Sequence, residues 1–216
     1  MGILKLAPSM LISYLFVLLV AFTVHEFAHA WTATHFGDET PRINGRLTLN
    51  PLAHLDPIGS LLLLFAGFGW AKPVPVNPYV LGRRSAAALM LVALAGPLSN
   101  LLMALIAAIP FRLGLVSALD AQIAIATGNQ HFLPTLSQLL FVFIQVNLVL
   151  MLFNLIPLAP LDGDKIAAYF FPASWSRTLD TIRPLGPIIL LAIAFFGVLN
   201  YILLPPLQLL MGLLVG

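Results

Sequence analysis

Long apolar runs without a charged residue divide this sequence, and shorter polar segments separate them. The runs cover 6–24, 85–111, 135–156 and 187–204, and the first is expected to continue as a helix to about His35. Each run is long enough for a helix that crosses a bilayer, which takes about 20 residues. The pattern predicts an all-α protein, a polytopic transmembrane helical bundle of about four spans.

Pro205 and Pro206 follow the last run directly. Because proline lacks a backbone N–H and clashes with the preceding turn, the pair is expected to end the helix at this point. The remaining tail, 205–216, would then be too short to cross a membrane as a helix of its own.

The segment between the first two runs is also apolar, but it is too short to cross. Residues 58–71 are interrupted by three glycines, among them Gly67. Apolar runs of this length are typical of re-entrant or interfacial segments. Two interpretations stay open: a short re-entrant or β-like loop that dips towards a wet cavity, or an interfacial half-helix anchored by Trp70 and Lys72.

The composition supports a membrane protein and excludes several other classes. Of the 216 residues 60% are hydrophobic and 8% are charged, whereas about 25% of a typical soluble domain is charged. The net charge of +2 is small and the basic residues are scattered, so nothing indicates nucleic-acid binding. The absence of cysteine excludes disulfides and thiolate ligands. The length predicts one domain, 1–216, with a core at 6–170 and a C-terminal span at 184–216.

The basic residues predict how the chain lies in the membrane. The segment 36–84 carries five Lys or Arg, and three more, among them Arg177, follow the third run. The opposite side has only Lys5 and Arg112. Because cytoplasmic loops are enriched in Lys and Arg, both rich segments are expected in the cytoplasm, with the N-terminus outside.

A metal motif lies near the end of the first run, in the sequence His25-Glu26-Phe27-Ala28-His29. Two histidines four residues apart lie on one face of a helix, where both imidazoles can reach one cation. Glu26 lies between them, where it could hold a metal-bound water. Ionisable groups at membrane depth are expensive, so by default they indicate function. The site is expected near the cytoplasmic face of the membrane.

The third metal ligand must come from His, Asp or Glu, because a catalytic zinc site usually has three protein ligands and an open position for water. Asp162 is the favoured residue. In the segment 154–163, two prolines before it end a helix and a glycine after it frees the next turn. The order of the spans brings Asp162 to the same membrane depth as the histidines. His54 and Asp56 are the rival ligands.

Together these motifs resemble those of the site-2 proteases, the zinc intramembrane metalloproteases of the M50 kind. The chain matches three core signatures of that family in order: H-E-x-x-H at 25–29, Gly96-Pro97-Leu98-Ser99-Asn100, and N-L-I-P-L-A-P-L-D-G at 154–163. The segment 69–78 also resembles the loop of short bacterial and archaeal members, and there is no PDZ-like insertion. The resemblance covers about 21–163 and implies a multi-pass protein of a prokaryotic-type cell membrane.

The resemblance implies an enzyme with one zinc ion per chain. The metal ligands would be His25, His29 and Asp162, and Glu26 would be the catalytic base. The reaction would be hydrolysis of a peptide bond in or near the transmembrane helix of a membrane-protein substrate, through zinc-bound water activated by Glu26. The expected partners are this substrate and the lipid bilayer, without nucleic acid; the sequence sets no oligomeric state.

Two asparagines are candidates for contact with the substrate. Asn154 matches the motif asparagine of the family and would donate to the oxyanion or hold the substrate backbone. Asn147 lies two turns earlier on the same helix face and would extend this strip, or it bonds between helices. The resemblance also implies that the exposed strand of an opened substrate pairs with the loop at 67–76.

Three further residues carry weaker signals. Gly96 and Asn100 are interpreted as packing residues, because a small residue lets helices approach and an amide bonds between them. Asp164 stands where the family often has a second glycine. It could compete for the metal or pair with Lys165.

Two other functions stay open. In a transporter or channel the same ionisable residues would form an ion pathway, although no repeat is detectable and the bundle is small for alternating access. An inactive scaffold would bind clients through the same fold. Glu26 argues against the scaffold, because a structural metal site needs no base.

Overall fold

The computed structural model describes residues 3–66, 69–127, 132–172 and 180–216. Gly67 and Arg177, which entered the expectations for the loop and for the orientation, lie outside these ranges. Within them, four helices are long and apolar enough to cross a membrane, and the described residues form no strand. The predicted all-α polytopic bundle is therefore confirmed.

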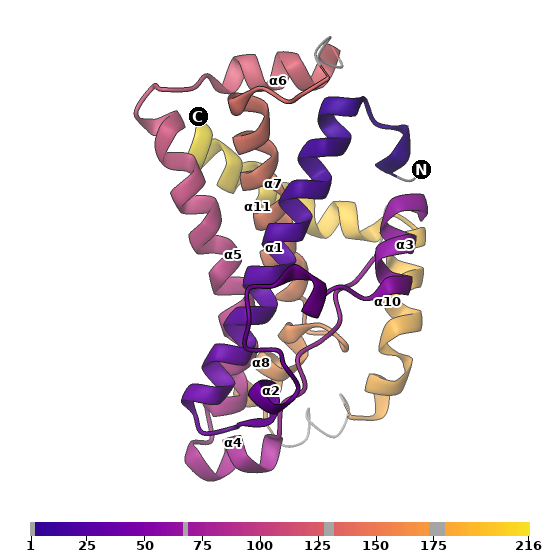
Figure 1. Ribbon diagram of the computed structural model, residues 1–216. Helices are drawn as coiled ribbons and strands as arrows, with labels where there is room; N and C mark the ends of the chain where they lie inside the picture. Colours follow the sequence, from indigo (N-terminus) through magenta and orange to yellow (C-terminus); the bar gives the residue numbers. More distant parts are fainter. Residues whose placement is uncertain (1–2, 67–68, 128–131, 173–179) are drawn as a thin grey trace.

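The helices of the described part are, in chain order, η1 (Ile3–Lys5), α1 (Pro8–His35), α2 (Thr40–Ile43), η2 (Pro51–Ala53), α3 (Pro57–Ala66), α4 (Pro78–Arg84), α5 (Ala88–Arg112), α6 (Ala118–Thr127), α7 (Leu136–Asn154), α8 (Asp162–Phe170), η3 (Arg183–Leu185), α10 (Gly186–Phe195) and α11 (Val198–Val215) (Figure 1). The candidate spans among them are α1, α5, α7 and α11. The first three match the predicted runs closely, because a long uncharged run is a local signal that needs no knowledge of packing.

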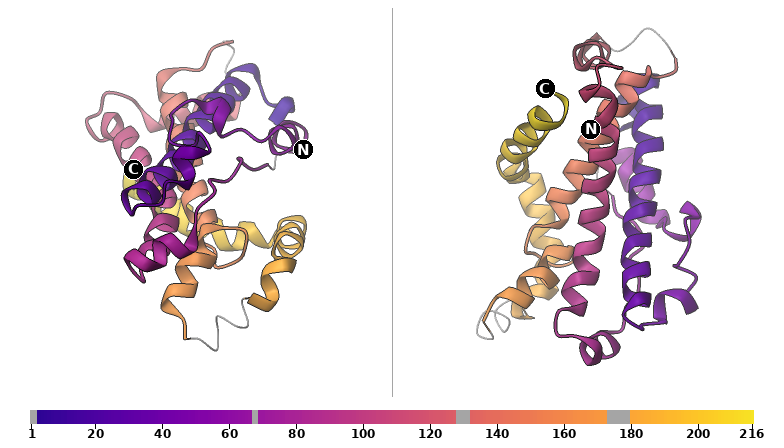
Figure 2. Two further views of the ribbon diagram at one scale, coloured as in Figure 1. Left: turned by 60° about the horizontal axis from the view of Figure 1, so that its bottom comes forward. Right: turned by 90° about the vertical axis from the view of Figure 1, so that its left-hand side faces the viewer.

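Three spans, α1, α5 and α7, pack side by side and form the centre of the bundle (Figure 2). α7 supplies fully buried side chains to both neighbours. Val142 belongs to one apolar cluster with Val17 of α1, and Ile144 and Leu148 belong to another with Ala104 and its neighbours on α5. Small residues such as these alanines let helix backbones approach closely, which favours association inside a lipid environment.

The predicted bounds of the last span, 187–204, are wrong. The chain forms α10 and then α11, and α11 continues through Pro205 and Pro206. The break lies at Gly197, whose φ of +71° is in the left-handed region that glycine adopts without strain. The two prolines remove two backbone donors, a loss that membrane helices tolerate where local groups satisfy the freed carbonyls. The tail that was expected to be too short to cross is thus part of a candidate span.

The segment between α1 and α5 combines a short helix with a β-like contact. α3 is apolar, as the sequence predicts for this region. Leu55 and Ala71 form an isolated antiparallel bridge, and the Lys72 N–H donates to the His54 carbonyl at 2.8 Å. The described part of this segment therefore contains features of both interpretations, a half-helix and a β-like pairing.

Two buried charged side chains hold the extended stretch 72–77. Arg46 donates to backbone carbonyls, including that of Lys72 at 3.3 Å. Asp38 accepts a hydrogen bond from the Asn77 N–H at 2.6 Å. Because a buried charge is costly unless it is hydrogen-bonded, both contacts favour this one placement of the stretch. The stretch forms one wall of the site that the next subsection describes.

The role of Gly197 gives a test of the fold. Replacement of Gly197 by Ala places a Cβ on a residue with φ +71°, which costs about 1–2 kcal/mol. We expect Gly197→Ala to lower the midpoint of thermal unfolding in detergent. Gly212→Ala is the matched control: it lies inside α11, nothing lies within 4 Å of its added Cβ, and it should be neutral or stabilising. Equal effects of the two substitutions would contradict this account of the break.

Candidate metal centre

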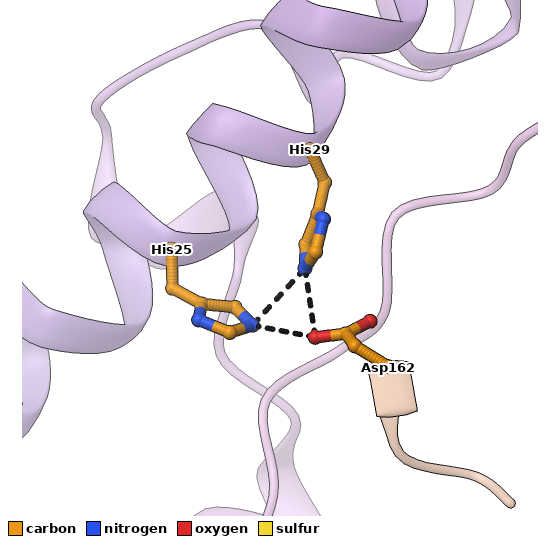
Figure 3. Close-up of side chains that lie close together, drawn as sticks. All are labelled: His25, His29 and Asp162. Atoms are coloured by element: carbon orange, nitrogen blue, oxygen red, sulfur yellow. Dashed lines mark hydrogen bonds and ion pairs between the residues drawn. The ribbon is translucent and has the colours of Figure 1, made fainter. Parts of the chain in front are cut away.

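His25 and His29 lie on the same face of α1 and point towards each other, as their spacing predicts (Figure 3). Their Nε2 atoms are 3.0 Å apart. Both side chains are buried, and so is the carboxylate of Glu26 between them. The helix alone sets this pair, since side chains at i and i+4 lie one above the other.

Asp162 reaches the two histidines from the start of α8 (Figure 3). Its Oδ2 lies 3.2 Å from the Nε2 atom of His25 and 3.2 Å from that of His29. α7 ends at Asn154, and the following coil contains Pro157 and Pro160, which cannot continue the helix. The structure thus brings together the three residues that the sequence predicts as metal ligands, and they form a group able to hold a metal ion.

The other ring nitrogen of each histidine donates to α5. His25 Nδ1 donates to Asn100 Oδ1 at 2.6 Å, and His29 Nδ1 donates to the Val92 carbonyl at 2.7 Å. Partners of this kind fix the tautomer and the orientation of metal-binding histidines. Because Pro97 has no backbone N–H, the carbonyl of Ala93, one residue after Val92, lacks its helical hydrogen bond.

A short relay fixes the orientation of the Asn100 amide. Asn100 Nδ2 donates to Asn147 Oδ1 at 2.8 Å, and Asn147 Nδ2 donates to the Phe143 carbonyl at 2.8 Å. The carbonyl can only accept, so each amide in the relay has one possible orientation. Asn100 therefore presents its oxygen to His25, and His25 carries its proton on Nδ1.

These protons make the centre suited to a cation. With a proton on Nδ1 of each neutral ring, the two Nε2 atoms present only lone pairs to each other and to the Asp162 oxygen. Three lone pairs at 3.0–3.2 Å repel one another, and a shared cation would turn this repulsion into attraction. For tetrahedral zinc with bonds of about 2.0–2.1 Å, adjacent ligand atoms lie about 3.3 Å apart. The donor set and its spacing fit zinc.

The second oxygen of Asp162 faces Lys165, whose Nζ lies 3.7 Å from Oδ1. A metal ligand has to be ionised, and the Lys165 ammonium next to Oδ1 favours the ionised form of this carboxyl.

Gly96 leaves the space that the imidazoles occupy. A Cβ at this position would lie 2.4 Å from His29 Nε2 and 2.6 Å from His25 Nε2. Side-chain rings packed at this depth cannot move without disturbing the centre. Gly96 and Asn100, interpreted from the sequence as packing residues, thus shape and orient the two histidines. In the sequence, the motif at 96–100 was the signal for these two residues. No residue type predicts that the Val92 backbone carbonyl accepts the hydrogen bond from His29.

Glu26 is held by the stretch 72–77. The Val74 N–H donates to Glu26 Oε2 at 3.1 Å. Pro73 and Pro75, on either side, have no N–H to offer. A backbone amide from a loop therefore helps to orient the carboxylate that is predicted as catalytic base.

A cavity of about 280 Å³ adjoins the centre. Its walls include Glu26, the two histidines, Asp162, Val74 and Asn154, together with apolar residues of α5 and α7. Asn154 is thus placed at the cavity, although its Nδ2 now donates to the Leu150 carbonyl at 3.0 Å. Asn147 is fully buried in the relay to Asn100 and does not line the cavity.

Neither the rival residues nor Asp164 belong to the metal group. His54 donates through Nε2 to the Thr48 carbonyl at 2.8 Å, and Asp56 accepts the Gly59 N–H at 2.8 Å. Asp164 pairs with Arg183, with 2.9 Å between Oδ2 and Nε. Of the two roles left open for Asp164, the pairing with Lys165 is not formed, because the partner of Asp164 is Arg183, 19 residues further along the chain.

The chain is similar to known proteins over most of its length. The model of "Peptidase family M50" matches residues 13–197. YwhC of Bacillus subtilis is 42% identical over 202 residues, which are 93% of this chain and 89% of that protein. Rip2 of Mycolicibacterium smegmatis is 30% identical over 189 residues, which are 84% of this chain and 66% of that protein. Both carry the description "putative zinc metalloprotease". No solved structure gives a significant match.

The position of Gly96 gives a test of the centre. Gly96→Ala should displace both imidazoles and weaken zinc binding by about tenfold or more, within the range found when groups that orient metal ligands are changed. Zinc affinity of the purified protein, measured by competition with a chromophoric chelator, checks this. Gly82→Ala is the control, since its added Cβ meets nothing within 4 Å. Wild-type affinity in Gly96→Ala would contradict the geometry.

Proposed function

We propose that this chain, which belongs to peptidase family M50 and is a metalloprotease, hydrolyses a peptide bond in or next to a transmembrane helix of another membrane protein. One observation carries the proposal: three converging ligand atoms and a buried carboxylate, Glu26, border the same cavity between the spans. An ion pathway in a transporter would not need the Glu26 carboxylate beside a complete group of three metal ligands.

In the proposed reaction His25, His29 and Asp162 hold zinc. When bound there, zinc lowers the pKa of a coordinated water to about 7 and polarises a carbonyl oxygen. The Glu26 carboxylate takes a proton from the attacking water and later passes it to the leaving amine. Asn154 exchanges its bond with Leu150 for one to the substrate and stabilises the negative charge on the carbonyl oxygen.

The position of the centre supports a substrate within the membrane. Glu26 lies about 27 Å along α1 from Pro8, at 1.5 Å per residue, while the hydrocarbon core of a bilayer is about 30 Å thick. The catalytic groups are thus close to one face of the membrane, where water can enter. We assign this face to the cytoplasm, because Lys and Arg are concentrated in the segments at this end of the spans.

The decisive test compares Glu26→Gln with wild type in detergent or vesicles. A panel of transmembrane peptides serves as substrate, and cleavage is followed by mass spectrometry with and without a chelator. We expect Glu26→Gln to retain zinc and to lose at least about a hundredfold in rate, because general acid–base catalysis contributes at least this much. Glu39→Gln is the matched control, since Glu39 is the only other glutamate and forms a surface pair with Arg42. Cleavage that survives Glu26→Gln or the chelator would refute the mechanism.

The amide of Val74 gives a second test of the role of Glu26. Val74→Pro removes the N–H that donates to Glu26 and keeps an apolar side chain, while Val74→Ala keeps the N–H. Because a hydrogen bond to a charged group contributes about 1.5–3 kcal/mol, we expect Val74→Pro to lower kcat about tenfold or more. Val74→Ala should stay near wild type, and both variants should bind zinc normally. If both variants lose kcat equally, the side chain matters rather than the amide.

A further inference from the structure

Asp164 is a second buried carboxylate beside the metal ligand Asp162. Both belong to the first turn of α8, and both side chains are buried. Asp164 Oδ2 accepts a hydrogen bond from Arg183 Nε at 2.9 Å. A buried carboxylate is costly unless it is paired and hydrogen-bonded, and Oδ1 has no partner among the described residues, so the Arg183 contact helps to fix where the turn lies.

Arg183 comes from a different part of the chain, at the start of η3, which leads into α10 and α11. Three residues later the same segment touches the coil before Asp162. A Cβ on Gly186 would lie 2.0 Å from the Ala159 carbonyl oxygen, so the two backbones are in direct contact. The C-terminal segment therefore contacts the turn that carries the metal ligand at two points, on either side of Asp162.

The coil before Asp162 has little helical structure of its own to hold it. Residues 155–161 lie between α7 and α8, and two of them are prolines. A metal ligand has to be held within about 0.5 Å of its productive position by groups that are themselves fixed. Since Asp162 and Asp164 share one helical turn, a contact that fixes Asp164 also fixes Asp162.

We propose that Arg183 is a positioning residue for the metal centre, acting through Asp164 on Asp162, so that the C-terminal helices help to place the third ligand. The inference rests on the proposed function, because it takes Asp162 to be a zinc ligand. Asp164 stands where the family often has a second glycine, so the proposed role belongs to this chain's own sequence.

Arg183 has a second acidic partner that provides an internal control. It also pairs with Asp180 through Nη1, but the side chain of Asp180 is 59% exposed, against 9% for Asp164. Arg183 itself is 38% exposed, but the Asp164 carboxylate is buried, and loss of its partner would leave that buried charge without compensation, whereas exposed pairs contribute little. Loss of Asp164 should therefore matter to the centre, and loss of Asp180 should not.

The experiment measures zinc affinity of the purified full chain by competition with a chromophoric chelator. We expect Arg183→Gln and Asp164→Asn each to weaken zinc binding by about 10–100-fold, the usual effect of removing a group that orients a ligand. The double variant should be no weaker than the weaker single one, because the two residues act as a unit. Asp180→Asn should remain within about twofold of wild type, and Arg183→Lys should recover most of the affinity.

Thermal unfolding of the metal-free variants separates positioning from a general role in stability. If Arg183→Gln and Asp164→Asn unfold at lower temperature but bind zinc like wild type, the inference is wrong. An equal loss in Asp180→Asn also overturns it. If Arg183→Gln does not fold, the zinc affinities of Asp164→Asn and Arg183→Lys test the inference instead. Asp164→Asn keeps the size of the side chain. A folded wild type that binds no zinc would refute the proposed function and this inference together, whereas wild-type binding with unaffected variants would refute this inference alone.

Discussion

The close approach of three basic atoms inside an apolar bundle is the constraint on which the rest of this structure depends. Two imidazole nitrogens and a carboxylate oxygen lie within 3.2 Å of one another, an arrangement that suits a bound cation and requires fixed ring orientations. α5 provides the fixed orientations although it supplies no ligand. Asn100 and the Val92 carbonyl accept the outer protons of the two rings, and Gly96 leaves the space between them. The packing of α1 against α5 is therefore part of the metal centre itself.

The third ligand depends on a different kind of support. The histidines share one helix, so their separation follows from helical geometry. Asp162 begins a short helix after a coil, and no repeating hydrogen bonds connect it to α1. Lys165 of the same helix lies near its outer oxygen, and tertiary contacts place the helix: α8 packs against α5, and the segment around Arg183 and Gly186 lies against its first turn. A bundle of α1, α5 and α7 alone would define two ligands well and leave the third less restricted.

The same distinction explains which features could be predicted from the sequence. The spans and the pair of histidines follow from local patterns, and Asp162 follows from the order and direction of the spans. The partners of His25 and His29 lie 75 and 63 residues away, and no local pattern specifies which faces of two apolar helices meet. Gly96 and Asn100 are visible as a motif, but their role needs the contact with α1. The last span was misplaced because Pro205 and Pro206 are stronger signals in sequence than Gly197, whose positive φ ends α10.

The Val74 amide shows how a catalytic base can be oriented without a dedicated side chain. The backbone N–H of this residue donates to Glu26, and every residue except proline has such a donor at position 74. The residue must therefore not be proline, although both of its neighbours are. Two prolines restrict the backbone on either side and remove competing donors, while Arg46 and Asp38 hold the ends of the stretch. The orientation of Glu26 is thus encoded by backbone restriction and by buried charges distant from the metal, which a search for catalytic residue types alone would miss.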